Sequence, residues 1–79
     1  MSNVKIQNVI EGPRRERIDR KTVTRYRQAL RRGDRFSPIV VIKWCPGCYE
    51  VQDGYHRLRA HRLEGRKTIA IFVMVDYSR

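Results

Sequence analysis

Cysteine, acidic residues and long hydrophobic runs are all scarce in this 79-residue chain. The longest apolar run covers residues 69–75, and no apolar stretch follows a basic one near the start, so we expect neither a signal peptide nor a membrane span. The only cysteines, Cys45 and Cys48, form one Cys-Pro-Gly-Cys element, which excludes the disulfide framework of a small secreted domain. We therefore expect a cytoplasmic protein.

The scarcity of acidic residues leaves a large positive charge. Against 8 Asp and Glu stand 18 Lys and Arg, for a formal charge of +10 on 9.5 kDa. A field of that size repels itself, and an anionic partner would offset it. A chain this short buries only roughly 60–65% of its unfolded surface, so residues 1–79 should form a single domain with one thin core. A deep multi-layer enzyme is excluded.

The apolar pattern predicts the element order β-α-β-β-α-β, a small α/β (α+β) domain. β-branched residues predict a first strand over residues 4–10, although the alternation breaks at Asn8, and a loop over residues 14–17. An almost continuous apolar run over residues 39–44 is typical of a strand that is buried on both faces. The Cys-Pro-Gly-Cys element then supplies turn chemistry for a hairpin.

A first helix of about 13 residues is predicted between an N-cap and a glycine stop. Asp19 is a good N-cap, and Gly33 follows two basic residues at the other end. The apolar stripe consists of Val23, Tyr26 and Leu30, and Ile18 can pack on Val23 as a hydrophobic staple.

A second helix and a last strand complete the expected fold. The helix should begin after Gly54 and end near Gly65, with packing positions at Leu58, Ala60 and Leu63. Residues 68–75 alternate two apolar faces, which predicts a central strand that is covered on both sides.

The most informative segment is Asp53-Gly54-Tyr55-His56-Arg57, where a strand passes through a glycine into a helix. The N–H groups and the positive end of the helix dipole converge at such a turn and bind phosphate oxygens. His56 and Arg57 in the first turn oppose the helix dipole unless an anion lies against them. In the alternative reading, Asp53 pairs with Arg57 and His56 packs against the sheet.

This pentapeptide, followed by Ala60, resembles the signature of the ParB/sulfiredoxin superfamily. The flanking helix, hairpin and strands occur in that superfamily's order and cover most of the chain. The resemblance implies that this turn holds nucleotide phosphates, with ATP, ADP or CTP as the ligand and Mg²⁺ as an accompanying ion. The residues that it would place at the cofactor are Gly54, Tyr55, His56 and Arg57.

This chain differs from each branch of the superfamily at residues that matter for activity, which limits the functions that the resemblance implies. Sulfiredoxins have a catalytic cysteine directly before the His-Arg pair, where this chain has Tyr55, so sulfinic acid reduction is not expected. Partition proteins that hydrolyse CTP have a glutamate and two arginines after the glycine, and they carry a helix-turn-helix domain that 79 residues cannot hold. Free-serine kinases share the Asp-Gly-x-His-Arg form and use a glutamate after the first strand as a base, which would be Glu11, or Glu16 in its place.

Arginines of the first helix form a second, less specific signal. Like charges recur four residues apart at Lys21 and Arg25 and at Arg27 and Arg31, and a polyanion would relieve their repulsion. The residues proposed to contact a nucleic-acid backbone are Arg20, Arg25, Arg27, Arg31, Arg32, Arg59 and Arg62. No aromatic RNA-binding motif is present, so sequence-specific base recognition is not supported. The alternative is an ordinary charged surface.

The cysteine pair has metal or redox spacing but supplies only two ligands of a structural zinc site, so we assign no metal ligands. Two turn residues, reduced or linked as a disulfide, are one reading, and zinc shared across a dimer is another. Trp44 and Tyr49, which flank the turn, are expected to pack as a cross-strand pair.

These features support a ParB-like module that binds nucleotide or nucleic-acid phosphates at residues 54–57, with a basic helix suited to DNA or RNA backbone contact. The alternative is a small nucleotide-dependent phosphotransferase or nuclease in which Glu11 or Asp53 acts as base. A third reading is a protein-interaction subunit that keeps the fold without the ligand. Whether the chain is an enzyme stays open at this point, as does its oligomeric state.

Overall fold

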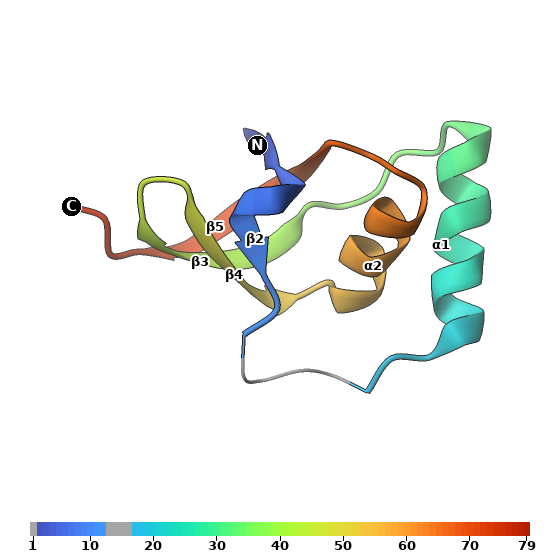
Figure 1. Cartoon of the computed structure of the whole chain (residues 1–79), viewed down its shortest axis with the longest axis horizontal. Helices are drawn as coiled ribbons and strands as arrows, with labels where there is room; N and C mark the ends of the chain where they lie inside the picture. Colours follow the sequence, from blue (N-terminus) through green and yellow to red (C-terminus); the bar gives the residue numbers. More distant parts are fainter. Residues whose placement is uncertain (1, 13–16) are drawn as a thin grey trace.

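The computed structural model describes residues 2–12 and 17–79. One sheet of five strands in the order β1-β5-β3-β4-β2 is covered on one face by two helices (Figure 1). The elements are β1 (Ser2–Lys5), a 3-10 turn (Ile6–Asn8), β2 (Val9–Ile10), α1 (Arg20–Arg32), β3 (Ile39–Cys45), β4 (Cys48–Asp53), α2 (Tyr55–Leu63) and β5 (Thr68–Asp76). The expected small α+β domain and its order of strands and helices are confirmed.

The helices form two successive layers beside the sheet. Tyr55 and Leu58 of α2 pack into the main core with buried residues of the sheet. Ala60, on another side of α2, packs against Val23 and Leu30 of α1. The short helix α2 is therefore the middle layer, and α1 reaches the sheet mainly through it (Figure 1). No described helix is long and apolar enough to cross a membrane.

The first strand is not continuous, contrary to the prediction for residues 4–10. β1 pairs antiparallel with β5 at one edge of the sheet, whereas β2 pairs parallel with β4 at the opposite edge. The 3-10 turn carries the chain between the two edges. Ile6 and Val9 lie three residues apart and are both buried, as the three-residue period of this turn allows. The break in alternation at Asn8 is the sequence feature that corresponds to this 3-10 turn.

The first helix has the predicted limits because both ends are fixed locally. Oδ1 of Asp19 accepts from the Lys21 N–H at 3.1 Å, and Oδ2 accepts from the Thr22 hydroxyl at 2.8 Å. These bonds to Thr22 and Lys21 lower the pKa of Asp19. At the other end Gly33 has φ 83°, a left-handed conformation that glycine adopts readily. The predicted loop over residues 14–17 lies outside the described residues except for Arg17.

The predicted hairpin is present, and a disulfide between Cys45 and Cys48 closes its turn. The two cysteines were expected to be either reduced or linked as a disulfide. The structure has the disulfide, and no described cysteine is left free. The predicted pairing of Trp44 with Tyr49 is not the contact that forms. Trp44 stacks on Tyr77 with ring centroids 4.9 Å apart, and its Nε1 donates to Glu50.

The last strand has neighbours on both sides, as expected of a central strand, but only one of its faces is covered. Ile69 and Ile71 are buried beneath the helices, whereas Phe72 and Met74 are more than half exposed. Coverage of both faces was therefore a wrong expectation for β5, and β3 is likewise only partly buried at Val40. Both helices stand on the same side of the sheet, and no described helix covers the opposite face.

Candidate functional site

The turn at residues 53–55 joins β4 directly to α2, and it requires glycine. Gly54 has φ 107°, in the left-handed region. A Cβ atom placed there would lie 2.5 Å from Cγ2 of Ile39, which belongs to the buried core. Both the backbone conformation and the close approach of β3 therefore exclude a larger residue.

Tyr55 anchors the turn in the core. Its side chain is 2% exposed, and its hydroxyl donates to the carbonyl of Val51 at 3.0 Å. The phenol is therefore committed to the fold, so the part of Tyr55 that can reach a ligand is its backbone. In the sulfiredoxin-like pattern a cysteine occupies this position, and here the position is a packing site.

His56 connects the first turn of α2 to the start of α1. The backbone N–H of Asp19 donates to Nε2 of His56 at 3.0 Å, although the two residues are 37 positions apart in the sequence. Nε2 is therefore the nitrogen of the His56 ring that accepts in this bond. His56 is thus bonded to the residue that caps α1. Two helix N-termini are consequently neighbours.

Arg57 holds the connection between α1 and β3 against the turn. Its NH1 donates to the carbonyl of Ser37 at 2.8 Å, and its NH2 lies 3.9 Å from Oδ2 of Asp53. The pairing of Asp53 with Arg57 therefore exists, at the long limit of ion-pair distances. The Arg57 side chain is 17% exposed and Asp53 is 67% exposed, so the guanidinium is partly sheltered at the surface of the turn.

Glu11, the candidate base, lies beside α2 between two arginines. Its Oε1 is 3.6 Å from NH2 of Arg59 and 3.7 Å from NH1 of Arg62, and this buried oxygen has no hydrogen-bond partner among the described atoms. Arg62 also donates to the carbonyl of Val9 at 2.6 Å. Glu11 thus offsets the charge of two of the arginines proposed for nucleic acid. Glu16, the second glutamate considered, lies outside the described residues.

The acidic candidates do not assemble into a metal cluster. Within residues 2–12 and 17–79, no three His, Cys, Asp or Glu side chains are grouped so that they could hold a metal ion. Asp53, near the turn, is exposed, while Glu11 is largely enclosed by its arginines. A magnesium ion at residues 54–57 would therefore take most of its oxygen ligands from a bound phosphate and water.

The repulsion predicted between Arg27 and Arg31 is relieved within the fold. Glu64, just after α2, accepts from Nε of Arg27 at 2.7 Å and from Nε of Arg31 at 2.7 Å. Its side chain is only 10% exposed, and the hydrogen bonds from Arg31 and Arg27 lower its pKa to about 2. No polyanion is needed to balance this pair. The sequence did not reveal the contact because the three residues meet only when the two helices pack.

The remaining arginines of the proposed interface differ in how far their charge is offset. Arg32 pairs with Asp34 at 2.9 Å, and both side chains are exposed. Arg20 and Arg25 are exposed and form no ion pair with a described carboxylate. Arg25 and Arg20 are therefore the arginines of α1 whose charge is most available to an outside anion.

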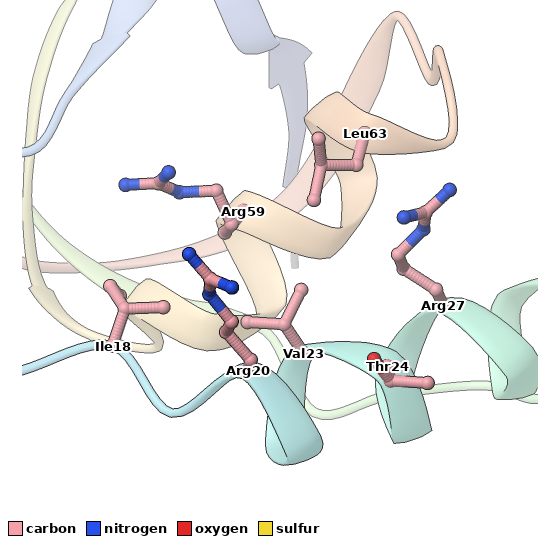
Figure 2. A pocket seen from close by; sticks show the side chains of 7 residues that line it. All are labelled: Ile18, Arg20, Val23, Thr24, Arg27, Arg59 and Leu63. Atoms are coloured by element: carbon pink, nitrogen blue, oxygen red, sulfur yellow. The ribbon is translucent and has the colours of Figure 1, made fainter.

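A cavity of about 410 Å³ lies between the outer faces of α1 and α2 (Figure 2). Its lining is Ile18, Arg20, Val23, Thr24, Arg27, Arg59 and Leu63. Leu63 was predicted to pack in the core, but it is 52% exposed. Figure 2 shows Leu63 of α2 and Val23 of α1 facing the space between the helices, with arginines on both sides. This cavity is separate from residues 54–57.

Solved structures share this fold. C-terminally truncated ParB from Caulobacter crescentus, complexed with CTP-γ-S, is 24% identical with a TM-score of 0.78 over 94% of this chain and 43% of that chain. The same partitioning protein complexed to the centromeric parS site gives 24% identity and a TM-score of 0.79 over 95% and 40%. This chain thus spans less than half of the ParB chains, and at these identities the likeness shows the fold.

Two further kinds of protein have the same architecture. Sulfiredoxin from Arabidopsis thaliana is 25% identical with a TM-score of 0.76, over 94% of this chain and 85% of that chain. A free serine kinase in complex with AMP is 16% identical with a TM-score of 0.76, over 92% and 30%. No curated protein matches the chain.

The family assignment comes from the sequence profile of the ParB N-terminal domain, which matches residues 1–78. That match covers nearly the whole chain, and it agrees with the strand–glycine–helix turn and with the shared fold. The chain therefore belongs to the ParB N-terminal domain family.

Proposed function

We propose that this chain is a ParB-like module that binds nucleotide or nucleic-acid phosphates at residues 54–57 and contacts a nucleic-acid backbone through α1. The observation that carries the proposal is the first turn of α2. It follows a glycine at which any side chain would be strained, it contains no acidic side chain, and it places His56 and Arg57 at the positive end of the helix.

The neighbouring start of α1 supports the same site. The Asp19 N–H to His56 bond brings two helix N-termini together, and an anion held between them would interact with both dipoles. Arg57 borders the turn from the side of Ser37. These groups suit the oxygens of a phosphate chain, as in ATP, ADP or CTP. That a ParB relative was solved with CTP-γ-S and a kinase relative with AMP favours nucleotides over other anions.

Backbone contact with DNA or RNA is the second part of the proposal. A ParB relative was solved on parS DNA, and the formal charge of +10 favours a polyanion. Within α1, Arg20 and Arg25 carry most of this role, because the charges of Arg27 and Arg31 are already offset by Glu64.

A charge substitution in the first turn tests the phosphate site. His56→Glu keeps an acceptor for the Asp19 N–H and places a carboxylate where the helix dipole favours it, so the helix should be retained. Phosphate should nevertheless be repelled, and CTP or ATP affinity should fall by roughly tenfold or more. Lys67→Gln, an exposed substitution near the opposite end of α2 with the same change in charge, is the matched control.

Nucleotide affinity is measured by titration of the folded variants, with circular dichroism to check helix content. Loss in His56→Glu with retention in Lys67→Gln supports the site. Equal affinities in the wild type and His56→Glu would overturn it.

A further inference from the structure

Leu63 is a large apolar side chain that is exposed although it belongs to the middle layer of the fold. It lies in the last turn of α2, the helix that is enclosed between the sheet and α1, yet 52% of its surface is exposed. It faces the cavity of about 410 Å³ between the two helices, together with Ile18 and Val23. These three aliphatic side chains form the apolar part of the lining. We call this the interhelical pocket.

Three arginines surround the apolar part of the interhelical pocket. Arg20 and Arg59 lie near one another, and Arg27 lies on the other side of Val23 (Figure 2). Arg20 has no ion pair with a described carboxylate, and Arg59 is 3.6 Å from Glu11, longer than the roughly 2.7–2.9 Å of a charge-assisted hydrogen bond. Arg27 is bonded to Glu64 through its Nε. Arg20 and Arg59 are therefore the strongest anion contacts available here.

The composition of the interhelical pocket distinguishes between possible occupants. None of its seven lining residues is aromatic, so an unpaired base would have no aromatic face on which to stack. A duplex presents its phosphates without an apolar group that could enter between the helices. An aliphatic side chain fits the apolar part, and carboxylates on either side of it suit bidentate guanidinium contacts.

We propose that the interhelical pocket docks an acidic peptide segment of a protein partner, with one aliphatic side chain inserted against Leu63 and Val23. Flanking carboxylates of the segment pair with Arg20 and Arg59. Arginine is enriched among the residues that contribute most to binding at protein interfaces. The pocket does not include residues 54–57, and it shares Arg20 with the nucleic-acid contacts proposed for α1.

The test uses two labelled peptides of about twelve residues with the same acidic content. One has a single central leucine, and the other has serine at that position. The leucine peptide should bind the full chain roughly tenfold more tightly, because only its central side chain can be buried against Leu63 and Val23. The methyl resonances of Val23 and Leu63 should shift on titration. Equal affinity of the two peptides would overturn the proposal.

Protein variants locate the binding. Leu63→Ser and Arg20→Gln should each weaken the leucine peptide by roughly fivefold or more, as expected of hot-spot residues. Arg35→Gln is a matched control, because it removes one exposed arginine outside the interhelical pocket. Equal losses in Arg20→Gln and Arg35→Gln would indicate attraction by net charge alone and overturn the proposal.

A competing oligonucleotide shows whether the interhelical pocket binds a peptide or a nucleic acid. If a single-stranded oligothymidine displaces the leucine peptide and shifts the Val23 and Leu63 methyl groups more strongly, the interhelical pocket is a nucleic-acid site and the peptide proposal is wrong. Peptide binding that persists with the oligonucleotide bound elsewhere supports it.

Discussion

The backbone N–H of Asp19 donates to Nε2 of His56 at 3.0 Å, so the residue that caps α1 is bonded to the first turn of α2. This single bond couples two helix starts that lie 37 residues apart in the sequence. The bond therefore holds the first turn of α2 beside the positive end of the α1 dipole.

Substitution of Gly54 should be far more damaging than substitution of a glycine with the same backbone conformation. Gly54→Ala places a Cβ 2.5 Å from Ile39, and we expect a loss of about 2–4 kcal/mol in the free energy of unfolding. Gly33 is also left-handed, at φ 83°, but a Cβ added there would have no neighbouring atom within 4 Å. Gly33→Ala should therefore lower the free energy of unfolding by only about 1–2 kcal/mol. Chemical denaturation measures both, and equal losses would show that the close approach to β3 is unimportant.

The ion pairs of Glu64 should make stability depend on acid pH. The pKa of Glu64 is lowered from 4.5 to about 2 in the folded chain by Arg31 and Arg27, so the unfolded chain takes up a proton first as pH falls. The stabilisation is complete above about pH 4.5 and is lost as pH falls through about 2. Thermal unfolding of Glu64→Gln should show a lower midpoint at pH 7 and a shallower decline in acid.

The matched control for Glu64 is the exposed pair of Arg32 with Asp34. Asp34→Asn should leave the midpoint at pH 7 nearly unchanged, because an exposed pair contributes roughly 0–1 kcal/mol. A Glu64→Gln profile that follows the wild type at every pH would contradict the role given to this clamp between the helices.

His61 should make the protein less stable below neutral pH. Burial lowers the pKa of His61 below 6.5, and the charges of Arg66 and Arg57 act in the same direction, despite a hydrogen bond to the Arg57 carbonyl. The unfolded chain therefore binds a proton at a higher pH than the folded one, and stability should fall as pH drops through 6.5. His61→Gln should flatten the unfolding midpoint between pH 7 and 5. An NMR titration giving a His61 pKa above 6.5 would contradict this.

Salt dependence of binding to a generic DNA duplex should separate the two kinds of arginine on α1. The logarithm of affinity should fall with the logarithm of salt concentration by roughly 0.9 for each phosphate that is neutralised. Arg25→Ala should reduce the slope by about one such unit, whereas Arg31→Ala should change it less, because Glu64 already offsets Arg31. A wild-type slope near zero would remove the nucleic-acid proposal.

Features fixed by neighbouring residues could be predicted from the sequence. The limits of α1 follow from Asp19 and Gly33, which cap its ends locally. The turn at Gly54 was likewise recognisable, because a strand, a glycine and a helix succeed one another without interruption.

Features that depend on packing between distant segments could not be predicted in the same way. The break of the first strand arises because β1 and β2 pair at opposite edges of the sheet. The counter-charge of Arg27 and Arg31 comes from Glu64, more than thirty positions away. Leu63 is 52% exposed where it lines the pocket between α1 and α2, a position that the apolar spacing of α2 alone does not specify.

Residue-by-residue NMR shows directly whether residues 54–57 bind phosphate. On titration of the ¹⁵N-labelled chain with CTP, ATP or ADP, the amide resonances of Gly54, Tyr55, His56 and Arg57 should shift first and furthest. The amide of Asp19 should follow, because it is bonded to His56. Amide resonances at 54–57 that stay unchanged at millimolar nucleotide, or shifts confined to other surfaces, would contradict the account.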